Sequence, residues 1–170
     1  RLDECLARQA AAAGADLHEG EKLTGYSGID APITIETTKG RYTAQVLVGA
    51  DGAYSTVARL GMFHNPRDVF IASEWDMPNP GLAQLYAGQA VFDFSAKPLG
   101  YYWIFPKDGD LNVGCGTSRN FAKGLNQAVA AYNRKWRVEG PATKAAHWIP
   151  FAKRGFQAAK GNVLLIDDAA

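Results

Sequence analysis

The sequence is short of cysteine, of net charge and of long apolar runs, and each shortage excludes something. Its 170 residues include two cysteines and carry a formal net charge of +1 at pH 7. Because Cys5 and Cys115 stand far apart, they predict neither a disulfide framework nor a metal site, and we expect a reducing, cytoplasmic compartment. A charge this small gives no electrostatic attraction for nucleic acid. No apolar run reaches the about 18 residues of a transmembrane helix.

Hydrophobic periodicity at the two ends of the chain predicts a mixture of helices and strands. Residues 2–13 repeat apolar side chains with the helical period, and residues 15–20 predict a short strand. Residues 33–48 alternate about a turn and predict a hairpin, and residues 55–61 predict a brief helix. Residues 163–166 are continuously apolar, which is typical of a strand buried on both faces in a parallel sheet.

The middle of the chain has a different pattern, with strand-like segments followed by one amphipathic helix. The apolar stripe of that helix begins after Asn120, a suitable N-cap, and runs to Trp136. An antiparallel sheet with one covering helix is therefore expected here. The expected strands are residues 69–75, 84–94, 100–105, 111–117 and 143–150.

One segment carries the strongest functional signal: a strand with three rings, a turn, and a strand with two glycines. By the period-2 rule the rings share one face, and an Asp108-Gly109 turn brings the second strand back beside the first. Bare glycines beside rings make a flat apolar wall with room for a long ligand, although many sheets bury aromatic rings for packing alone. The residues concerned are Tyr101, Trp103, Phe105, Pro106, Gly114 and Gly116.

The spacing of these six residues resembles the signature of the geranylgeranyl reductase family. It reads Tyr-x-Trp-x-Phe-Pro, seven residues, then Gly-x-Gly, and it fixes six positions across sixteen residues. The family comprises flavin enzymes of the para-hydroxybenzoate hydroxylase fold group. The resemblance implies that all six residues line the site for a prenyl chain in a substrate-binding domain.

The resemblance also implies how the chain is divided. We expect an α+β fold in which an antiparallel β-sheet substrate domain with a covering helix, residues 63–160, is inserted in an incomplete α/β FAD-binding (Rossmann-like) domain. Residues 1–62 form the first part of that domain, and residues 161–170 form its returning strand. On this interpretation the chain is an internal fragment of a larger protein.

Residues 49–57 resemble the mid-chain Asp-Gly motif of flavin hydroxylases and reductases. A strand end followed by glycine lets backbone approach a phosphate, and amides are exposed where the next helix begins. The resemblance implies that Asp51, Gly52 and Ala53 lie near FAD. The alternative is a plain strand-to-helix turn that Asp51 or Ser55 caps.

Residues 161–170 resemble the family's second flavin motif, a strand followed by Gly-Asp-Ala-Ala. The resemblance implies that Asp168 bonds to a ribityl hydroxyl of FAD and that Ala169 also lies at the cofactor. Asp167 replaces the family glycine, and its carboxylate would meet the anionic pyrophosphate. The Gly-x-Gly-x-x-Gly turn of an opening βαβ unit is absent from the sequence, so we expect this chain alone to bind flavin poorly and to be inactive.

The implied activity is that of a FAD-dependent oxidoreductase that reduces carbon–carbon double bonds of a prenyl or other isoprenoid substrate, with NAD(P)H or another reductant as electron donor. Such a lipid substrate allows peripheral contact with a membrane. Two alternatives stay open: a flavin monooxygenase or quinone-linked dehydrogenase of the same fold, and a flavin-free module that binds an apolar ligand. No catalytic residue is assigned. The possible proton donors, each better explained as structural, are Tyr101, Tyr102, Cys115 and His147.

Overall fold

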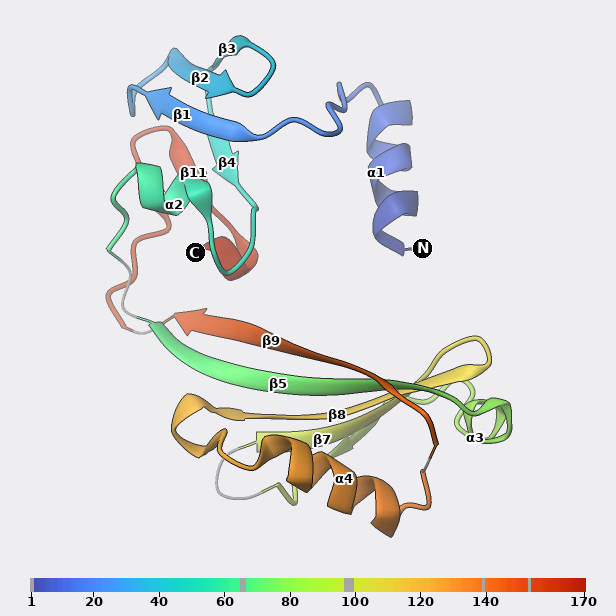
Figure 1. The fold of residues 1–170 in the computed structure, drawn as a ribbon. Helices are drawn as coiled ribbons and strands as arrows, with labels where there is room; N and C mark the ends of the chain where they lie inside the picture. The colour runs from blue at the N-terminus through green and yellow to red at the C-terminus, as the bar shows by residue number, and fades with distance from the viewer. Residues whose placement is uncertain (1, 65–66, 97–99, 139, 153) are drawn as a thin grey trace.

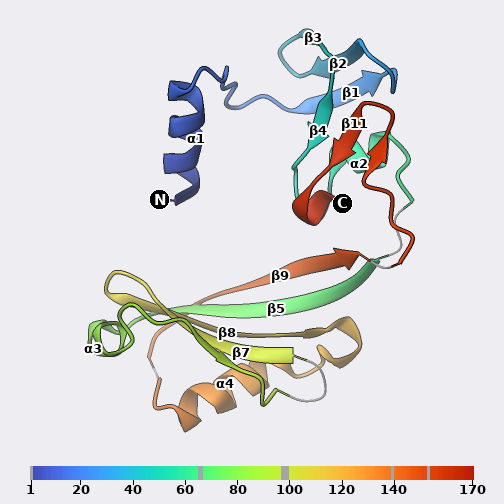
Figure 2. The same cartoon turned by 180° about the vertical axis from the view of Figure 1, so that it is seen from behind.

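Two groups of secondary-structure elements make up the protein, and two chain segments join them (Figure 1). The computed structural model describes residues 2–64, 67–96, 100–138, 140–152 and 154–170. In both views the first group lies on one side of a five-stranded sheet and helix α4 lies on the other (Figures 1 and 2).

The first group combines the N-terminal part of the chain with its C-terminal end. A β1-β2-β3 antiparallel sheet lies next to a second small sheet, in which β11 pairs parallel with β4 and antiparallel with β10. The β2–β3 pairing confirms the expected hairpin. The elements are α1 (Leu2–Ala12), β1 (Leu23–Ser27), β2 (Ile33–Thr37), β3 (Arg41–Ala44), β4 (Leu47–Gly49), α2 (Thr56–Leu60), β10 (Ala159–Lys160), β11 (Val163–Leu165) and η2 (Asp167–Ala169).

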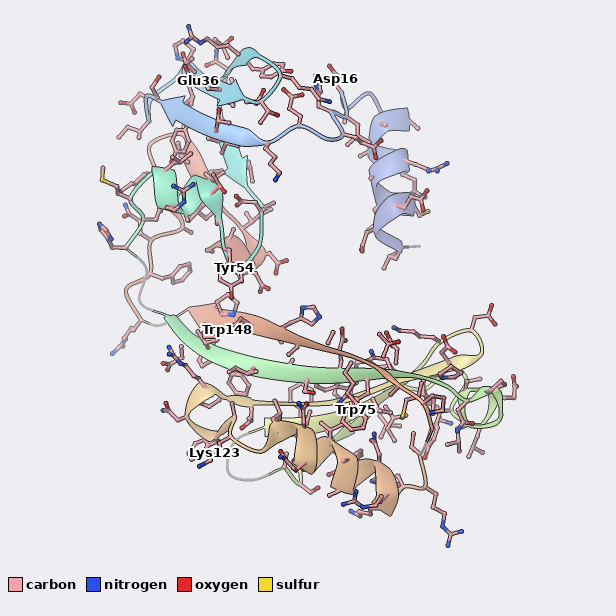
Figure 3. The ribbon with its side chains drawn as sticks, viewed as in Figure 1. Asp16, Glu36, Tyr54, Trp75, Lys123 and Trp148 are labelled. Atoms are coloured by element: carbon pink, nitrogen blue, oxygen red, sulfur yellow. The ribbon has the colours of Figure 1, made fainter. Side chains whose placement is uncertain are left out.

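The second group is the five-stranded antiparallel sheet with its helices, in the order β6-β7-β8-β5-β9. Its helix-covered face holds a closed core, in which Ile104 and Val113 are fully buried and Tyr102 stacks on Tyr132 of α4 at 4.1 Å between ring centroids. Trp75 of β5 points toward α4 as well (Figure 3). The prediction of an antiparallel sheet covered by a helix is confirmed. The elements are β5 (Arg67–Pro78), α3 (Pro80–Leu85), β6 (Val91–Asp93), β7 (Gly100–Pro106), β8 (Asp110–Ser118), η1 (Arg119–Phe121), α4 (Leu125–Lys135) and β9 (Thr143–Ala152).

The strand at the C-terminal end is buried on one face only, so the expectation of burial on both faces is wrong for the described chain. Val163 and Leu165 are buried in the core of the first group, whereas Leu164 is 36% exposed. Val48, its partner on β4, is 47% exposed. Side chains alternate across a strand, and here only one side of the small sheet is covered.

Three other expectations need correction. Residues 15–20 form no strand, and the first strand is β1. Residues 84–94 do not form a continuous strand, because Asn79 caps α3 by accepting a hydrogen bond from the Leu82 amide at 3.1 Å. Helix α4 begins at Leu125 instead of following Asn120, since Gly124 precedes it with a φ of 86°. Among the described helices, none is long and apolar enough to cross a membrane.

Candidate functional site

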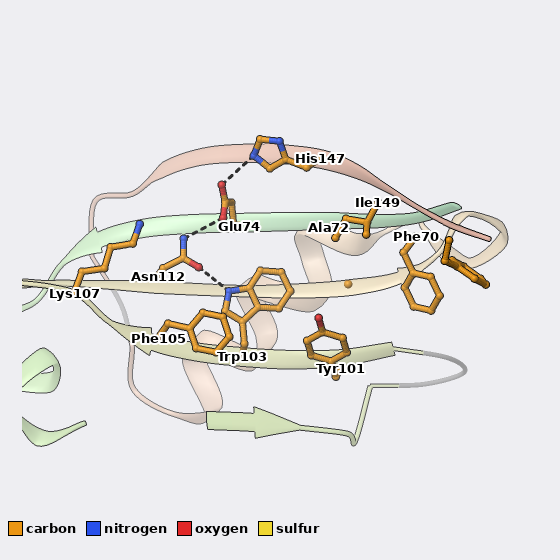
Figure 4. A pocket seen from close by; sticks show the side chains of 12 residues that line it. Phe70, Ala72, Glu74, Tyr101, Trp103, Phe105, Lys107, Asn112, His147 and Ile149 are labelled. Atoms are coloured by element: carbon orange, nitrogen blue, oxygen red, sulfur yellow. Dashed lines mark hydrogen bonds and ion pairs between the residues drawn. The ribbon is translucent and has the colours of Figure 1, made fainter. Parts of the chain in front are cut away.

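The uncovered face of the five-stranded sheet carries an apolar groove of about 690 Å³ (Figure 4). Strands β5, β7, β8 and β9 each contribute side chains that alternate with those of the core beneath α4. Rings and aliphatic side chains form most of the lining, which comprises Phe70, Tyr101, Trp103, Phe105, Ile149 and Phe151 among others.

The β7–β8 register places each ring beside a small residue or an amide. Tyr101 pairs with Gly116 and Trp103 pairs with Gly114. A Cβ atom on Gly114 would lie 2.2 Å from Cζ2 of Trp103, so the indole occupies the space that a side chain would need. A Cβ atom on Gly116 would lie 3.8 Å from Cζ3 of Trp103. The structure thus gathers these residues, together with Phe105, on one face, and their part in substrate binding stays a prediction.

Pro106 is the exception among the six signature residues. Because side chains alternate along β7, Pro106 does not face the groove that Phe105 lines. It lines a separate pocket of about 470 Å³ together with Ala83 and Gly109. Its place in the fold is the end of the strand, where it pairs with Leu111.

A hydrogen-bonded network of polar side chains occupies one end of the groove (Figure 4). The indole Nε1 of Trp103 donates to Oδ1 of Asn112 at 2.6 Å. The amide Nδ2 of Asn112 donates to Oε2 of Glu74 at 3.2 Å. The other oxygen of Glu74 lies 3.0 Å from Nε2 of His147. The network therefore connects the floor of the groove to its rim across β7, β8, β5 and β9.

A second carboxylate lies behind this network. Asp76 accepts hydrogen bonds from Nδ2 of Asn112 at 2.9 Å and from Nζ of Lys107 at 2.7 Å. Burial raises the pKa of the Asp76 carboxyl, but the hydrogen bonds from Lys107 and Asn112 outweigh it and hold the pKa below its ordinary value. Asp76 is therefore ionised at neutral pH and holds the ammonium group of Lys107.

The network was not anticipated from the sequence, although part of its signal is visible there. Glu74 and Asp76 follow Ala72 with period 2, which predicts that the three share a face. What the sequence does not show is that β5 lies between β8 and β9. That pairing brings Asn112 and His147 to Glu74.

The structure separates the four possible proton donors into two pairs. Tyr101 and His147 line the groove. Tyr102 and Cys115 lie on the opposite face of the sheet, where Cys115 is buried in a cluster with Val129 of α4. Burial raises the pKa of the Cys115 thiol to about 11. Neither member of the second pair can deliver a proton into the groove.

The two segments that resemble flavin motifs meet at the carboxyl ends of the parallel strands β4 and β11. Gly49 at the end of β4 pairs with Leu165 at the end of β11, and the Ile166 amide donates to the Gly49 carbonyl at 3.0 Å. Residues 50–54 and 166–170, which we call the strand-end loops, therefore leave the sheet side by side. Ligands of α/β sheets bind at the carboxyl ends of parallel strands.

Within the first loop the side chain of Asp51 bonds to its own turn. Its carboxylate accepts hydrogen bonds from the Ser55 hydroxyl at 2.5 Å and from the Thr56 amide at 2.6 Å. It also accepts one from the Val57 amide at 3.3 Å. Burial raises the pKa of Asp51, but these hydrogen bonds outweigh it and the pKa is lowered. This geometry matches the alternative interpretation of the motif, a strand-to-helix turn that Asp51 caps. The carboxylate of Asp51 bonds to the turn and does not point to a ligand site.

The backbone of the strand-end loops nevertheless fits the approach of a dinucleotide cofactor. Gly52 has a φ of 76°, and no atom lies within 4 Å of the place where its Cβ would be. Asp167 has a φ of 53°, in the left-handed region that favours glycine. The residue at 167 is thus held in a conformation suited to the glycine of the family motif. Among the described residues no cluster of His, Cys, Asp or Glu is placed to hold a metal ion.

Two curated relatives are similar to the chain over much of its length. An uncharacterised protein of Methanosarcina barkeri is 29% identical over 175 residues, which cover 99% of this chain and 44% of that protein. A digeranylgeranylglycerophospholipid reductase of Methanocaldococcus jannaschii is 31% identical over 122 residues, which cover 68% of this chain and 31% of that protein. The chain spans less than half the length of these relatives. No family model matches the chain.

Solved structures share the fold over nearly the whole chain. A flavoprotein/dehydrogenase from Cytophaga hutchinsonii matches with a TM-score of 0.70 at 16% identity. The matched region covers 99% of this chain and 46% of the Cytophaga chain. HpxO of Klebsiella pneumoniae, solved with FAD and uric acid, has a TM-score of 0.62 at 16% identity and covers 98% of this chain and 47% of its own. The chain therefore belongs to the geranylgeranyl reductase family and has the fold of flavin-dependent oxidoreductases of the para-hydroxybenzoate hydroxylase group.

Proposed function

We propose that this chain is part of a flavin-dependent oxidoreductase that reduces carbon–carbon double bonds of a prenyl lipid. One observation carries the proposal. The β7–β8 register sets Tyr101 and Trp103 beside Gly116 and Gly114, and an apolar groove is open above them. A relative named for the reduction of a digeranylgeranyl lipid supports the substrate class.

In this proposal the groove binds the hydrocarbon chain and excludes water from it. The faces of Tyr101 and Phe105 supply apolar surface, and Gly116, which has no side chain, leaves room for a chain to lie across the sheet. Hydrophobic contact of this kind contributes roughly 25 cal/mol for each Å² that is buried. Helix η2 lies next to β9, the strand at one edge of the sheet, and β9 contributes to the lining of the groove (Figures 1 and 2). We propose that a cofactor at the strand-end loops would reach the groove from this edge.

The strand-end loops would hold FAD through backbone and small side chains. We infer contacts from Gly52 and Ala53 in the first loop and from Asp168 and Ala169 in the second. A bound reduced flavin supplies the hydride for the reduction. We further propose that residues 1–62 and 161–170 belong to the FAD-binding domain and residues 63–160 to the inserted substrate domain, with NAD(P)H or another reductant as electron source.

The proton for the reduction would come from Tyr101 or His147, which line the groove, or from water at its open side. A protein that acts on membrane lipids must also approach the membrane surface, so we propose peripheral contact.

A second candidate function, flavin-free binding of an apolar ligand, is favoured by one observation: Asp167 puts a carboxylate where the family motif has glycine.

The test uses the chain expressed together with the sequence that flanks it in its gene. Flavin absorbance is measured after purification with added FAD, and the protein is then reduced with dithionite without oxygen and given a geranylgeranyl glycerolipid. We expect bound flavin and, by mass spectrometry, the gain of two hydrogens per reduced double bond. Tyr101→Ala should slow the reaction, whereas Phe121→Ala, an exposed ring outside the groove, should not.

Each alternative has its own outcome in that test. An oxygenated product that forms only in air would indicate a monooxygenase. Reduction of a quinone in place of the alkene would indicate a quinone-linked dehydrogenase. Binding of the lipid with no bound flavin at any FAD concentration would indicate the flavin-free module.

A further inference from the structure

We propose that the polar end of the groove selects a neutral, oxygen-bearing headgroup, such as a hydroxyl or a glycerol, and rejects a phosphate attached directly to the prenyl chain. This inference deepens the proposed function and rests on it. The polar end is defined by Glu74, Lys107, Asn112 and His147, which line the groove, and by Asp76 behind them.

Polar and apolar lining residues are segregated along β5 and β9 (Figure 4), whereas β7 contributes rings along the whole groove, including Phe105 beside Asn112. On β5 the lining changes from Phe70 to Glu74, and on β9 it changes from Phe151 to His147. Phe70 pairs with Ile149, so the two strands place their apolar lining residues at the same end. A groove with this pattern fits an amphiphile that lies along the strands with its head at the Glu74 end.

The charges at the polar end disfavour an anion. Among the described lining residues, Lys107 is the one side chain with a permanent positive charge, and Asp76 already holds its ammonium group at 2.7 Å. The Asn112 amide donates to both Glu74 and Asp76. Both donors of the Asn112 amide and one donor of the Lys107 ammonium are thus used on carboxylates. A phosphate bound here would lie beside two carboxylates, which repel it.

A hydroxyl group, in contrast, finds hydrogen-bond acceptors at the polar end. The side chain of Glu74 is 32% exposed and that of His147 is 61% exposed, so both can be reached from the groove. A carboxylate has about four lone-pair sites, and Glu74 uses few of them on Asn112 and His147. The headgroup would therefore donate to Glu74 while the prenyl chain lies on the rings. In a phospholipid, the glycerol would lie here and the phosphate beyond the end of the groove.

The experiment compares two probes with the same C20 chain, geranylgeraniol and geranylgeranyl diphosphate, by titration of the 170-residue chain with tryptophan fluorescence as readout. We expect the alcohol to bind about tenfold more tightly than the diphosphate at low salt. Glu74→Gln should reduce that preference several-fold by admitting the diphosphate. Glu36→Gln, a strand carboxylate outside the groove that pairs with Arg41, should leave it unchanged.

A second variant protects the test against a folding defect of the first. Lys107→Ala leaves Asp76 without its cation, so it should weaken diphosphate binding further and increase the preference for the alcohol. Equal or tighter binding of the diphosphate by the unmodified chain would overturn the inference and leave the proposed function standing. The inference would also fail if Glu74→Gln, shown to be folded by circular dichroism, kept the full preference. Failure of both probes to bind would overturn the inference and the proposed function together.

Discussion

The groove and the strand-end loops present opposite kinds of surface to a ligand. In the groove, Tyr101 and Phe105 direct their rings toward open space, and Gly116 of β8 adds no side chain to that space, while the indole of Trp103 covers Gly114. At the loops, the carboxylate of Asp51 turns inward and bonds to Ser55 and Thr56. A ligand in the groove thus meets side chains, whereas a ligand at the loops meets mainly backbone.

The two sites also differ in what holds them in place. The groove depends on pairing between four long strands, so its shape is a property of the whole sheet. Each strand-end loop is stabilised locally, the first by the bonds of Asp51 and the second by the backbone hydrogen bonds of its turn, from the Ala169 amide to the Ile166 carbonyl and from the Ala170 amide to the Asp167 carbonyl. Substitutions in the groove should therefore change ligand binding as well as packing, and substitutions in the loops should act first on the turn itself.

The largest effect on stability and on ligand binding is expected at Gly114, which lies in the sheet directly beneath the indole of Trp103. The Cβ of a Gly114→Ala variant would lie 2.2 Å from Cζ2 of Trp103 and 2.5 Å from the carbonyl oxygen of Ser73. Because both distances are far below van der Waals contact, strand and indole must shift, and we expect a loss of about 1–3 kcal/mol in the free energy of unfolding. Urea unfolding followed by circular dichroism measures it, and titration with geranylgeraniol should show weaker binding.

Gly116→Ala is the matched control for that variant. Its Cβ would lie 3.8 Å from Cζ3 of Trp103, which is an ordinary contact. We expect the free energy of unfolding to stay within about 0.5 kcal/mol of the unmodified chain. If the two alanine variants behaved alike, the indole would not lie over Gly114, and the groove would lose its floor.

Much of this groove is predictable from the sequence because β7 and β8 are neighbours in the chain. The Asp108-Gly109 turn fixes the hairpin, and alternation then places Tyr101, Trp103 and Phe105 on one face. The polar end is different, since Glu74 and His147 come from strands 73 residues apart in sequence. Alternation shows which residues of a strand share a face, but it does not show which distant strands lie side by side.

The incorrect element assignments have local causes. In the segment before β6, Asn79 as N-cap and Pro80 at the first helical turn favour a helix, and a strand prediction from the apolar residues that follow takes no account of them. The start of α4 is set by Gly124 in a left-handed conformation, which a hydrophobic stripe does not reveal. Likewise, whether Leu164 is buried depends on what covers the small sheet and not on the apolar run itself.

A smaller effect on the free energy of unfolding is expected at Asp51. A substitution there tests the stability of the capped turn and not ligand binding. Asp51→Ala removes the acceptor for the Thr56 amide and the Ser55 hydroxyl, and it should lower the free energy of unfolding by about 1 kcal/mol at neutral pH. The folded-state pKa of Asp51 is lowered, so this stabilisation is present above the unfolded-state pKa of about 3.9 and is lost as the pH falls through the folded-state value.

Urea unfolding at neutral pH and at about pH 2 checks both parts of this prediction. The difference between Asp51→Ala and the unmodified chain should be present at neutral pH and should shrink in acid. Glu19→Ala, at an exposed loop position, provides the control and should cost little at either pH. A cost at Asp51 that did not change with pH would show that the carboxylate charge does not stabilise the turn.

The smallest expected effect on stability is at Asp167, where conformation and charge can be separated. Asp167→Gly relieves a φ of 53° and should raise the free energy of unfolding by a few tenths of a kcal/mol, whereas Asp167→Asn should leave it nearly unchanged. Both variants remove the carboxylate. If FAD binds at the strand-end loops, both should therefore bind it more tightly than the unmodified protein, on the order of tenfold.

Flavin absorbance and fluorescence of the chain with its natural flanking sequence measure this affinity, and Asp168→Asn, which removes a proposed ribityl contact, should weaken it. Tighter binding by the glycine variant alone would indicate that the Cβ of residue 167 blocks close approach and that its charge has little influence. If neither variant changed the affinity, the pyrophosphate would not lie at this loop. The strand-end loops would then be a structural turn, and flavin would be held elsewhere.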